Sequence, residues 1–207
     1  MNTYDDEPDL LARTRKGDLD AFNSLVERFQ SPVYSLCLRM LASPPAAEDA
    51  AQEAFISAFR SINSFRGGSF RAWLFRIAAN ACYDEIRRRR SRRTRSLDEP
   101  RDDDTRPIDV ADPAPALDER AEAAELGAFI QDALSRLPSD QRLAVILCDV
   151  QGLDYAEIAE ATAASLGTVK SRISRGRANL RVLLRAGGEL LPTRFRQASE
   201  GQNDATL

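Results

Sequence analysis

The feature that most constrains the fold is a helical spacing of apolar residues, which recurs through most of the chain. From Leu19 to Phe29, and again from Leu126 to Leu137, apolar side chains fall three or four positions apart. That spacing places them on one face of an α-helix. No stretch alternates apolar and polar residues over a useful length, as a half-buried strand would. The sequence therefore predicts an all-α fold.

Prolines, glycines and acidic residues divide this pattern into two domains. Helices are expected to begin after Asp18, to restart at Pro32, to break at Pro44 and to resume near Phe70. After Pro138 a further helix is expected, capped by Ser139. Residues 98–116 carry four prolines among aspartates and lack apolar periodicity. We expect an N-terminal segment 1–17, a helical domain 18–95, a flexible acidic linker 96–120, a second helical domain 121–187 and a disordered tail 188–207.

Charge is distributed unevenly along a chain whose net charge is only −3. Seven of the nine residues from 87 to 95 are arginine, whereas residues 98–125 hold eleven acidic and three basic residues. Residues 165–185 hold six basic residues and no acidic one. Two basic blocks on either side of an acidic segment indicate a nucleic-acid partner, which the near-neutral total hides.

Several classes of protein are disfavoured by what the sequence lacks. There is no histidine, and Cys37, Cys82 and Cys148 form no Cys-x-x-Cys pair, so we expect three buried thiols, no metal site and no cofactor. A phosphate-binding loop and a nucleophile elbow are both missing, which argues against an enzyme. The longest uncharged apolar stretch is far too short to cross a bilayer, and the start lacks the features of a signal peptide. A cytoplasmic protein without membrane insertion is expected.

A helix-turn-helix is predicted near the C-terminus, over about residues 154–185. Asp154 and Glu157 have the spacing of a capping box, and a short turn at Ala163 precedes a helix that begins near Leu166. Ala163 departs from the glycine that such turns often use for a left-handed residue. The second helix is apolar on one face and cationic on the other, as insertion into a major groove requires. The plainer alternative is a solvated basic helix.

The cationic face of this helix supplies the candidates for contact with duplex DNA. Lys170 and Arg175 are expected to donate to guanine edges, whereas Arg172 and Arg177 are expected to meet phosphates. The full set of candidates is Lys170, Ser171, Arg172, Ser174, Arg175 and Arg177.

A second polar stripe lies on the helix expected after Phe70. The stripe consists of four residues spaced four, three and four positions apart, which therefore share one helical face: Arg76, Asn80, Tyr83 and Arg87. An aromatic ring and an amide beside cations suit single-stranded bases, which offer a π-face and a polar edge. The alternative is an ordinary exposed helix face. The candidates for single-strand contact, with one ring from the preceding loop, are Phe65, Arg76, Asn80, Tyr83, Arg87 and Arg88.

Four segments make the chain resemble the extracytoplasmic-function (ECF) sigma factors, a two-domain group of bacterial sigma factors. They are AEDAAQEAF at 47–55, FRAWLFRIAAN at 70–80, GLDYAEIA at 152–159 and GTVKSRISRGR at 167–177. Their order and spacing agree with the family over well over half the chain. Ala50 and Ala51 are smaller than the residues of many relatives, and Ser174 lies at a variable position, so the promoter sequence does not carry over.

The resemblance implies a fold, partners and a role. A region 2-like helical bundle would bind the β′ clamp helices of core RNA polymerase through Asp49, Gln52 and Glu53, which are otherwise a solvated acidic face. The same domain would melt and capture the −10 element of promoter DNA. A region 4-like helix-turn-helix domain would read the −35 element and sit on the β flap. The resemblance further implies transcription initiation in a stress or envelope response, under an anti-sigma factor.

Three alternatives remain open on the residues alone. A stand-alone helix-turn-helix regulator would bind DNA without polymerase, and residues 87–95 would serve equally as an RNA-binding arm. An enzyme is the weakest alternative. We also expect the isolated chain to bind DNA poorly, because a flexible linker lets the two domains drift apart.

Overall fold

The computed structural model describes residues 6–95 and 117–187. Within these ranges it contains no strand, which confirms the all-α prediction. Most of the predicted linker and the whole predicted tail lie outside the described residues. The α-helices are α1 (Glu7–Arg15), α2 (Leu19–Leu41), α3 (Pro44–Ser61), α4 (Phe70–Arg95), α5 (Leu117–Ser135), α6 (Ser139–Val145), α7 (Tyr155–Thr162) and α8 (Leu166–Ala186).

The first domain is built from α1 to α4, and α2 is its central helix. Asp18 caps α2 as expected, because its carboxylate accepts a hydrogen bond from the Ala21 amide at 3.1 Å. The predicted restart at Pro32 is wrong, since α2 runs through it without a break. Proline removes one intrahelical donor, and the apolar face that continues on both sides of it holds the helix together. The helix ends at Leu41, and Ala42, which follows it, has a left-handed φ of 52°.

Helix α1 was not expected from the sequence, where residues 1–17 carry no clear amphipathic pattern. Leu10, Leu11 and Thr14 are nevertheless buried, so α1 packs one short face onto the first domain. The break at Pro44 is confirmed, because α3 begins there after Ser43. Helix α4 begins at Phe70 and continues into the arginine block.

The second domain is built from α5 to α8, with a π-helical turn at Ile146–Val150. The expected cap at Ser139 is wrong: Pro138 occupies the capping position with an extended ψ of 137°, and Ser139 is already helical. The capping box of α7 is confirmed, with the Asp154 carboxylate accepting from two amides and Glu157 reaching back to the Asp154 amide. Ala163 adopts the left-handed conformation, with a φ of 49°, so the predicted turn forms without glycine.

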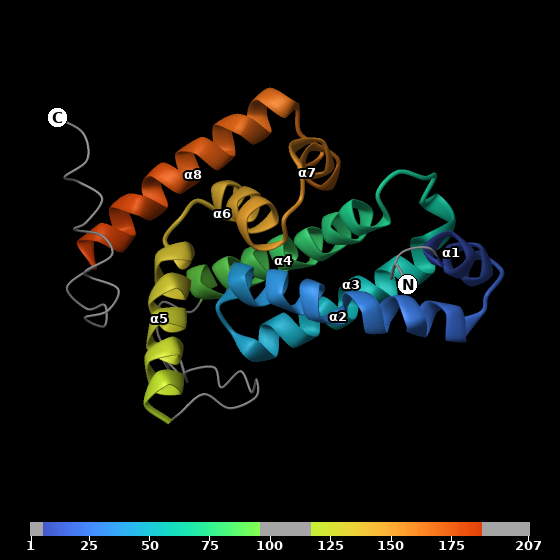
Figure 1. Cartoon of the computed structure of the whole chain (residues 1–207), viewed down its shortest axis with the longest axis horizontal. Helices are drawn as coiled ribbons and strands as arrows, with labels where there is room; N and C mark the ends of the chain where they lie inside the picture. The colour runs from blue at the N-terminus through green and yellow to red at the C-terminus, as the bar shows by residue number, and fades with distance from the viewer. Residues whose placement is uncertain (1–5, 96–116, 188–207) are drawn as a thin grey trace.

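The two domains pack directly against each other rather than lying apart. Helices α6 and α7 lie against α2 and α4 (Figure 1). One continuous cluster of buried apolar residues includes Leu36 and Phe75 of the first domain and Leu147 and Ile158 of the second. The structure therefore differs from the expectation that the domains drift apart, because apolar surface on both of them is removed from water by their contact.

Candidate nucleic-acid and protein interfaces

A cap at its first turn and a closely packed buried face hold helix α8 in a fixed position. The Ser165 hydroxyl caps its first turn by accepting from the Thr168 amide at 3.2 Å. Val169, Ile173 and Gly176 form its buried face. A Cβ at Gly176 would lie 2.7 Å from a methyl carbon of Val145 and 3.1 Å from a backbone oxygen of α6. Helices α6 and α8 therefore cross so closely that only glycine fits at this point.

The predicted duplex-binding residues divide into two groups. Lys170, Ser174 and Arg175 are exposed, and among the described residues no hydrogen bond or ion pair holds the side chains of Lys170 and Arg175. Arg172 and Arg177 are instead engaged inside their own domain. The guanidinium groups of these two arginines donate to Asp140 at 3.1 Å and to Asp149 at 2.5 and 3.0 Å, respectively.

The ion pair of Arg177 is the stronger of the two. Its hydrogen bonds with Asp149 raise the pKa of Arg177 above its ordinary value, against the smaller opposing effect of burial. Ser171, the last candidate of the set, is half-buried. Lys170 and Arg175 are thus exposed candidates, whereas the guanidinium groups of Arg172 and Arg177 are paired with carboxylates of their own domain.

The predicted single-strand stripe lies along α4 but is not uniformly accessible. Asn80 is exposed and Arg76 is half-buried. Arg87 and Arg88 are exposed and pair with Asp84 and Glu85 of the same helix.

Tyr83, in the middle of the stripe, lies under the second domain. Its hydroxyl is 3.5 Å from the backbone oxygen of Ser139, and burial raises the pKa of the phenol. The stripe is therefore continuous along the helix, but the second domain partly covers its central ring.

Phe65 lies in the core rather than on the surface. Its ring packs edge-on against Phe70 and in a tilted contact with Trp73, with centroids 5.6 and 5.5 Å away, and it is only 5% exposed. The Arg15 guanidinium covers the ring and donates to the Phe65 backbone oxygen at 2.5 Å. The expected stacking of Phe65 on a base has no support in this conformation, because the aromatic cluster already uses its faces.

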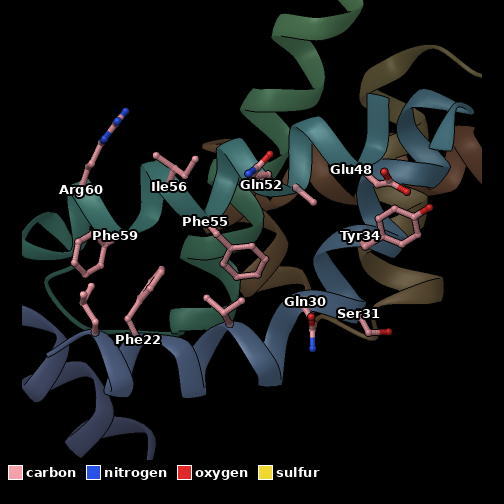
Figure 2. A pocket seen from close by; sticks show the side chains of 13 residues that line it. Phe22, Gln30, Ser31, Tyr34, Glu48, Gln52, Phe55, Ile56, Phe59 and Arg60 are labelled. Carbon is pink, nitrogen blue, oxygen red and sulfur yellow. The ribbon is translucent and has the colours of Figure 1, made fainter. Parts of the chain in front are cut away.

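An apolar groove lies on the first domain, between α2 and α3. Its volume is about 910 Å³, and the rings of Phe22, Phe55 and Phe59 form its floor (Figure 2). Leu19 and Ile56 stand on its rim with 60% and 38% of their surface exposed. Exposed apolar surface gathered in a concave site is typical of a protein-binding groove.

The predicted polymerase-binding residues lie on α3 beside this groove. Gln52 lines the groove directly, together with Glu48 (Figure 2). Asp49 and Glu53 are exposed on the neighbouring face of α3. This face borders the part of α4 that carries Arg87 and Arg88. The sequence pointed to the polar residues of this surface and missed its apolar part. The signal was present, because Leu19, Phe22 and Val26 extend the apolar stripe of α2 further than one buried face requires.

The cysteines carry no sign of chemistry. Cys37 and Cys82 are buried, and a hydrogen bond between them together with burial raises the pKa of the Cys82 thiol far above its ordinary value. Cys148 is half-buried, so the expectation of three buried thiols holds for two of them. In residues 6–95 and 117–187 no group of metal-ligating side chains comes together, and no helix is long and apolar enough to cross a membrane.

Comparison with protein families gives two matches that follow the two domains. Residues 25–92 match the model of sigma-70 region 2, and residues 130–180 match the model of sigma-70 region 4. Over 163 residues the chain is 41% identical to the ECF RNA polymerase sigma factor SigE of Mycolicibacterium smegmatis, covering 79% of this chain and 61% of that protein. It is 35% identical to the RNA polymerase sigma-H factor of Pseudomonas aeruginosa over 86% of this chain and 93% of that one.

Two solved structures have the same arrangement of helices. CnrH in complex with the cytosolic domain of CnrY superposes with a TM-score of 0.63 at 27% identity, covering 88% of this chain and 99% of CnrH. The sigma factor RpoE of Bartonella quintana, in complex with the anti-sigma factor NepR, gives 0.60 at 28% identity, covering 79% and 96%.

Proposed function

Because this chain belongs to the ECF group of bacterial sigma factors, we propose that it binds core RNA polymerase and directs it to one class of promoter. In this proposal the protein carries out no catalytic step of its own. It supplies recognition, and the polymerase supplies the chemistry.

The observation that supports this proposal most directly is the pairing of two different surfaces on one chain. Helix α8 presents Lys170 and Arg175 to solvent on a helix-turn-helix, and the first domain presents an apolar groove edged by Gln52. A regulator that acts alone needs the first surface but has no use for the second. A polymerase subunit needs both.

The groove suits a helix of the polymerase clamp. Aromatic floors with apolar rims accept the apolar face of a partner helix, and polar residues at the edge fix its register. Asp49 and Glu53 add negative charge along the same helix, which favours a basic partner surface. We therefore place the β′ clamp helices between α2 and α3, with Gln52 at their edge.

DNA recognition divides between the two domains in this proposal. Helix α8 reads the −35 element in the major groove through Lys170 and Arg175. Arg76 and Asn80 meet the −10 element after its strands separate, with Tyr83 as the stacking ring once it is uncovered. Since promoter DNA and polymerase are in the cytoplasm, the chain acts there.

An anti-sigma factor is the second expected partner. Both solved structures above hold a chain similar to this one together with a second protein, and in one of them the two are named as a sigma factor and an anti-sigma factor. We extend that partnership to this chain, in a stress or envelope response that such a factor would control.

Transcription in vitro tests the proposal. The full chain is combined with core RNA polymerase and a library of randomised promoters, and the transcripts are sequenced. Enrichment of one paired −35 and −10 motif is the expected result. Specific DNA binding by the chain without any association with core polymerase would favour the stand-alone regulator instead.

A further inference from the structure

Arg172 and Arg177 stand on opposite borders of the buried face of α8. At about 100° per residue they are about 140° apart around the helix axis, and the buried Ile173 and Gly176 lie between them. A helix that enters a major groove turns its outward side to the base edges, so its two borders face the phosphates of the two strands. The two arginines therefore hold positions from which a cation meets phosphate.

A carboxylate of the same domain holds each of these two guanidinium groups. Asp149 accepts from Nη2 and Nε of Arg177 at 2.5 and 3.0 Å, which is the two-point contact that phosphate oxygens also make with arginine. Asp140, in α6, accepts from Nε of Arg172 at 3.1 Å. The exposed fractions of the four side chains range from 31% to 47%, so a DNA phosphate can reach and compete for each arginine.

The π-helical turn Ile146–Val150 places Asp149 against α8. The hydrogen bond from the Gln151 amide to the Ile146 oxygen, at 2.9 Å, closes this wider turn. Turns of this kind are rare, and they occur frequently at functional sites. The turn also brings Sγ of Cys148 to 3.4 Å from Nη2 of Arg177. Two neighbouring residues of the turn thus use all the donors on the Nε and Nη2 edge of that guanidinium.

These pairs affect the two parts of DNA affinity unequally. Phosphate contacts supply nearly all of the affinity for duplex of random sequence, whereas base contacts supply the preference for one sequence. An arginine that is held by a carboxylate gives up that partner before it gains a phosphate, so it adds little to binding at a random site. Lys170 and Arg175 are exposed on the outward side of α8, and they keep their contribution wherever the bases match.

We propose that Asp140 and Asp149 stand in for DNA phosphates, and that by occupying Arg172 and Arg177 they lower the affinity of α8 for duplex DNA of random sequence. This proposal rests on the proposed function, since it takes α8 as the helix that binds duplex DNA. Its direction separates it from a role in which the carboxylates only orient the arginines. Removal of a carboxylate strengthens binding to random DNA here, whereas it would weaken binding if the carboxylate prepared the arginine for phosphate.

The test removes one carboxylate at a time from the full chain. Asp149→Asn keeps the size of the side chain and removes its charge, which releases Arg177. Asp132→Asn is the matched control, because Asp132 pairs at 2.8 Å with Arg136 at the end of α5 and loses the same charge. Asp140→Asn tests the second pair, and it keeps the proposal testable if Asp149→Asn disturbs the fold. Circular dichroism shows whether each variant is folded.

Fluorescence anisotropy with a labelled duplex of random sequence gives the affinity at several salt concentrations. Asp149→Asn is expected to bind at least about threefold more tightly than the wild type at about 0.1 M salt. Its plot of log affinity against log salt should be steeper by about 0.9, as for one additional neutralised phosphate. Asp140→Asn should shift the affinity in the same direction by a smaller factor, and Asp132→Asn should follow the wild type. Weaker binding by Asp149→Asn, or an unchanged salt dependence, would overturn the proposal.

The same substitution is then made in a chain that also carries Arg177→Gln. We expect the gain from Asp149→Asn to disappear there, because no guanidinium is left to be released. A gain of equal size with and without Arg177 would show that the lost charge acts at a distance, and it would overturn the proposal. These measurements use no polymerase. Failure of the proposed function would appear separately, as a wild-type chain that does not associate with core polymerase.

Discussion

The two surfaces proposed to bind DNA differ in how the fold exposes them. Helix α8 displays Lys170 and Arg175 on a helix that caps and close packing hold rigid. The stripe on α4 has its central ring, Tyr83, under the other domain. A helix that reads duplex DNA gains from being rigid and exposed, since duplex is always present. A face that stacks unpaired bases tolerates many sequences, because every base offers a π-face.

The largest expected effect tests whether α8 depends on its close crossing with α6. Gly176→Val places side-chain atoms where Val145 and the backbone of α6 already lie, so we expect a loss of about 3 kcal/mol in the stability of the second domain. Thermal unfolding followed by circular dichroism measures it. Ala178→Val, at an exposed position of the same helix, is the control and should change little. Equal melting of the two variants would contradict the crossing.

The next effect concerns the groove of the first domain. Ile56→Asp puts a charge on its apolar rim, and we expect affinity for core polymerase to fall by about 2 kcal/mol or more, as at the centre of a protein interface. Titration of labelled chain with core polymerase measures the change. Ser24→Asp adds the same charge to an exposed position of α2 that does not line the groove, and it should leave the affinity unchanged.

The exposed cations of α8 come third. Lys170→Ala and Arg175→Ala should each weaken −35 recognition by about 1–3 kcal/mol if they meet base edges. Arg177→Ala should cost less, because Asp149 already engages that guanidinium. Promoter selection by holoenzyme, compared among the three variants, gives the order. A larger loss from Arg177→Ala would place the ion-paired arginine in the groove instead.

A smaller effect is expected on the stripe of α4. Asn80→Ala removes one amide from the stripe, worth about 1 kcal/mol for a single hydrogen bond. Promoter opening, followed by permanganate footprinting, should slow, whereas duplex binding stays the same. An equal loss in both steps would count against a single-strand role for α4.

The smallest effect compares the two domains directly. Each one has a helix that ends on a left-handed alanine, Ala42 after α2 and Ala163 after α7. Glycine adopts this conformation without strain, so Ala42→Gly and Ala163→Gly should each stabilise the protein by up to about 1 kcal/mol. In a closed chain both changes shift one common unfolding transition. Two transitions, each responding to only one of the substitutions, would show that the domains unfold separately.

The sequence predicted local structure well wherever the deciding residues are neighbours. The spacing of Asp154 and Glu157 predicts the start of α7, and the apolar spacing of α8 separates its buried face from its basic face. The predicted helix start at Pro32 was wrong, because a proline inside a long amphipathic helix has the same local sequence pattern as a proline at a helix start. Ser139 misled for a similar reason, since the preceding proline already takes the extended conformation of a cap.

The parts that could not be predicted depend on residues far apart in the chain. The contacts of Arg142 with Met40 and of Gln151 with Pro32 join positions that no local pattern connects. Phe65 precedes Gly67 and Gly68 in a loop, where an exposed side chain is expected. Its ring instead packs against Phe70 and Trp73. Burial of this kind follows from tertiary packing, which a periodicity along one helix does not encode.

The tight crossing at Gly176 has a consequence for how promoter preference can change. The one position of α8 that tolerates no side chain faces inward, whereas Lys170, Ser174 and Arg175 are exposed on the outward face. Substitutions on the outward face therefore carry almost no folding cost, as surface changes generally do. If the outward face of α8 reads the −35 element as proposed, it can be varied on a stable frame, and the domain is then a scaffold for engineering sigma factors with orthogonal promoters.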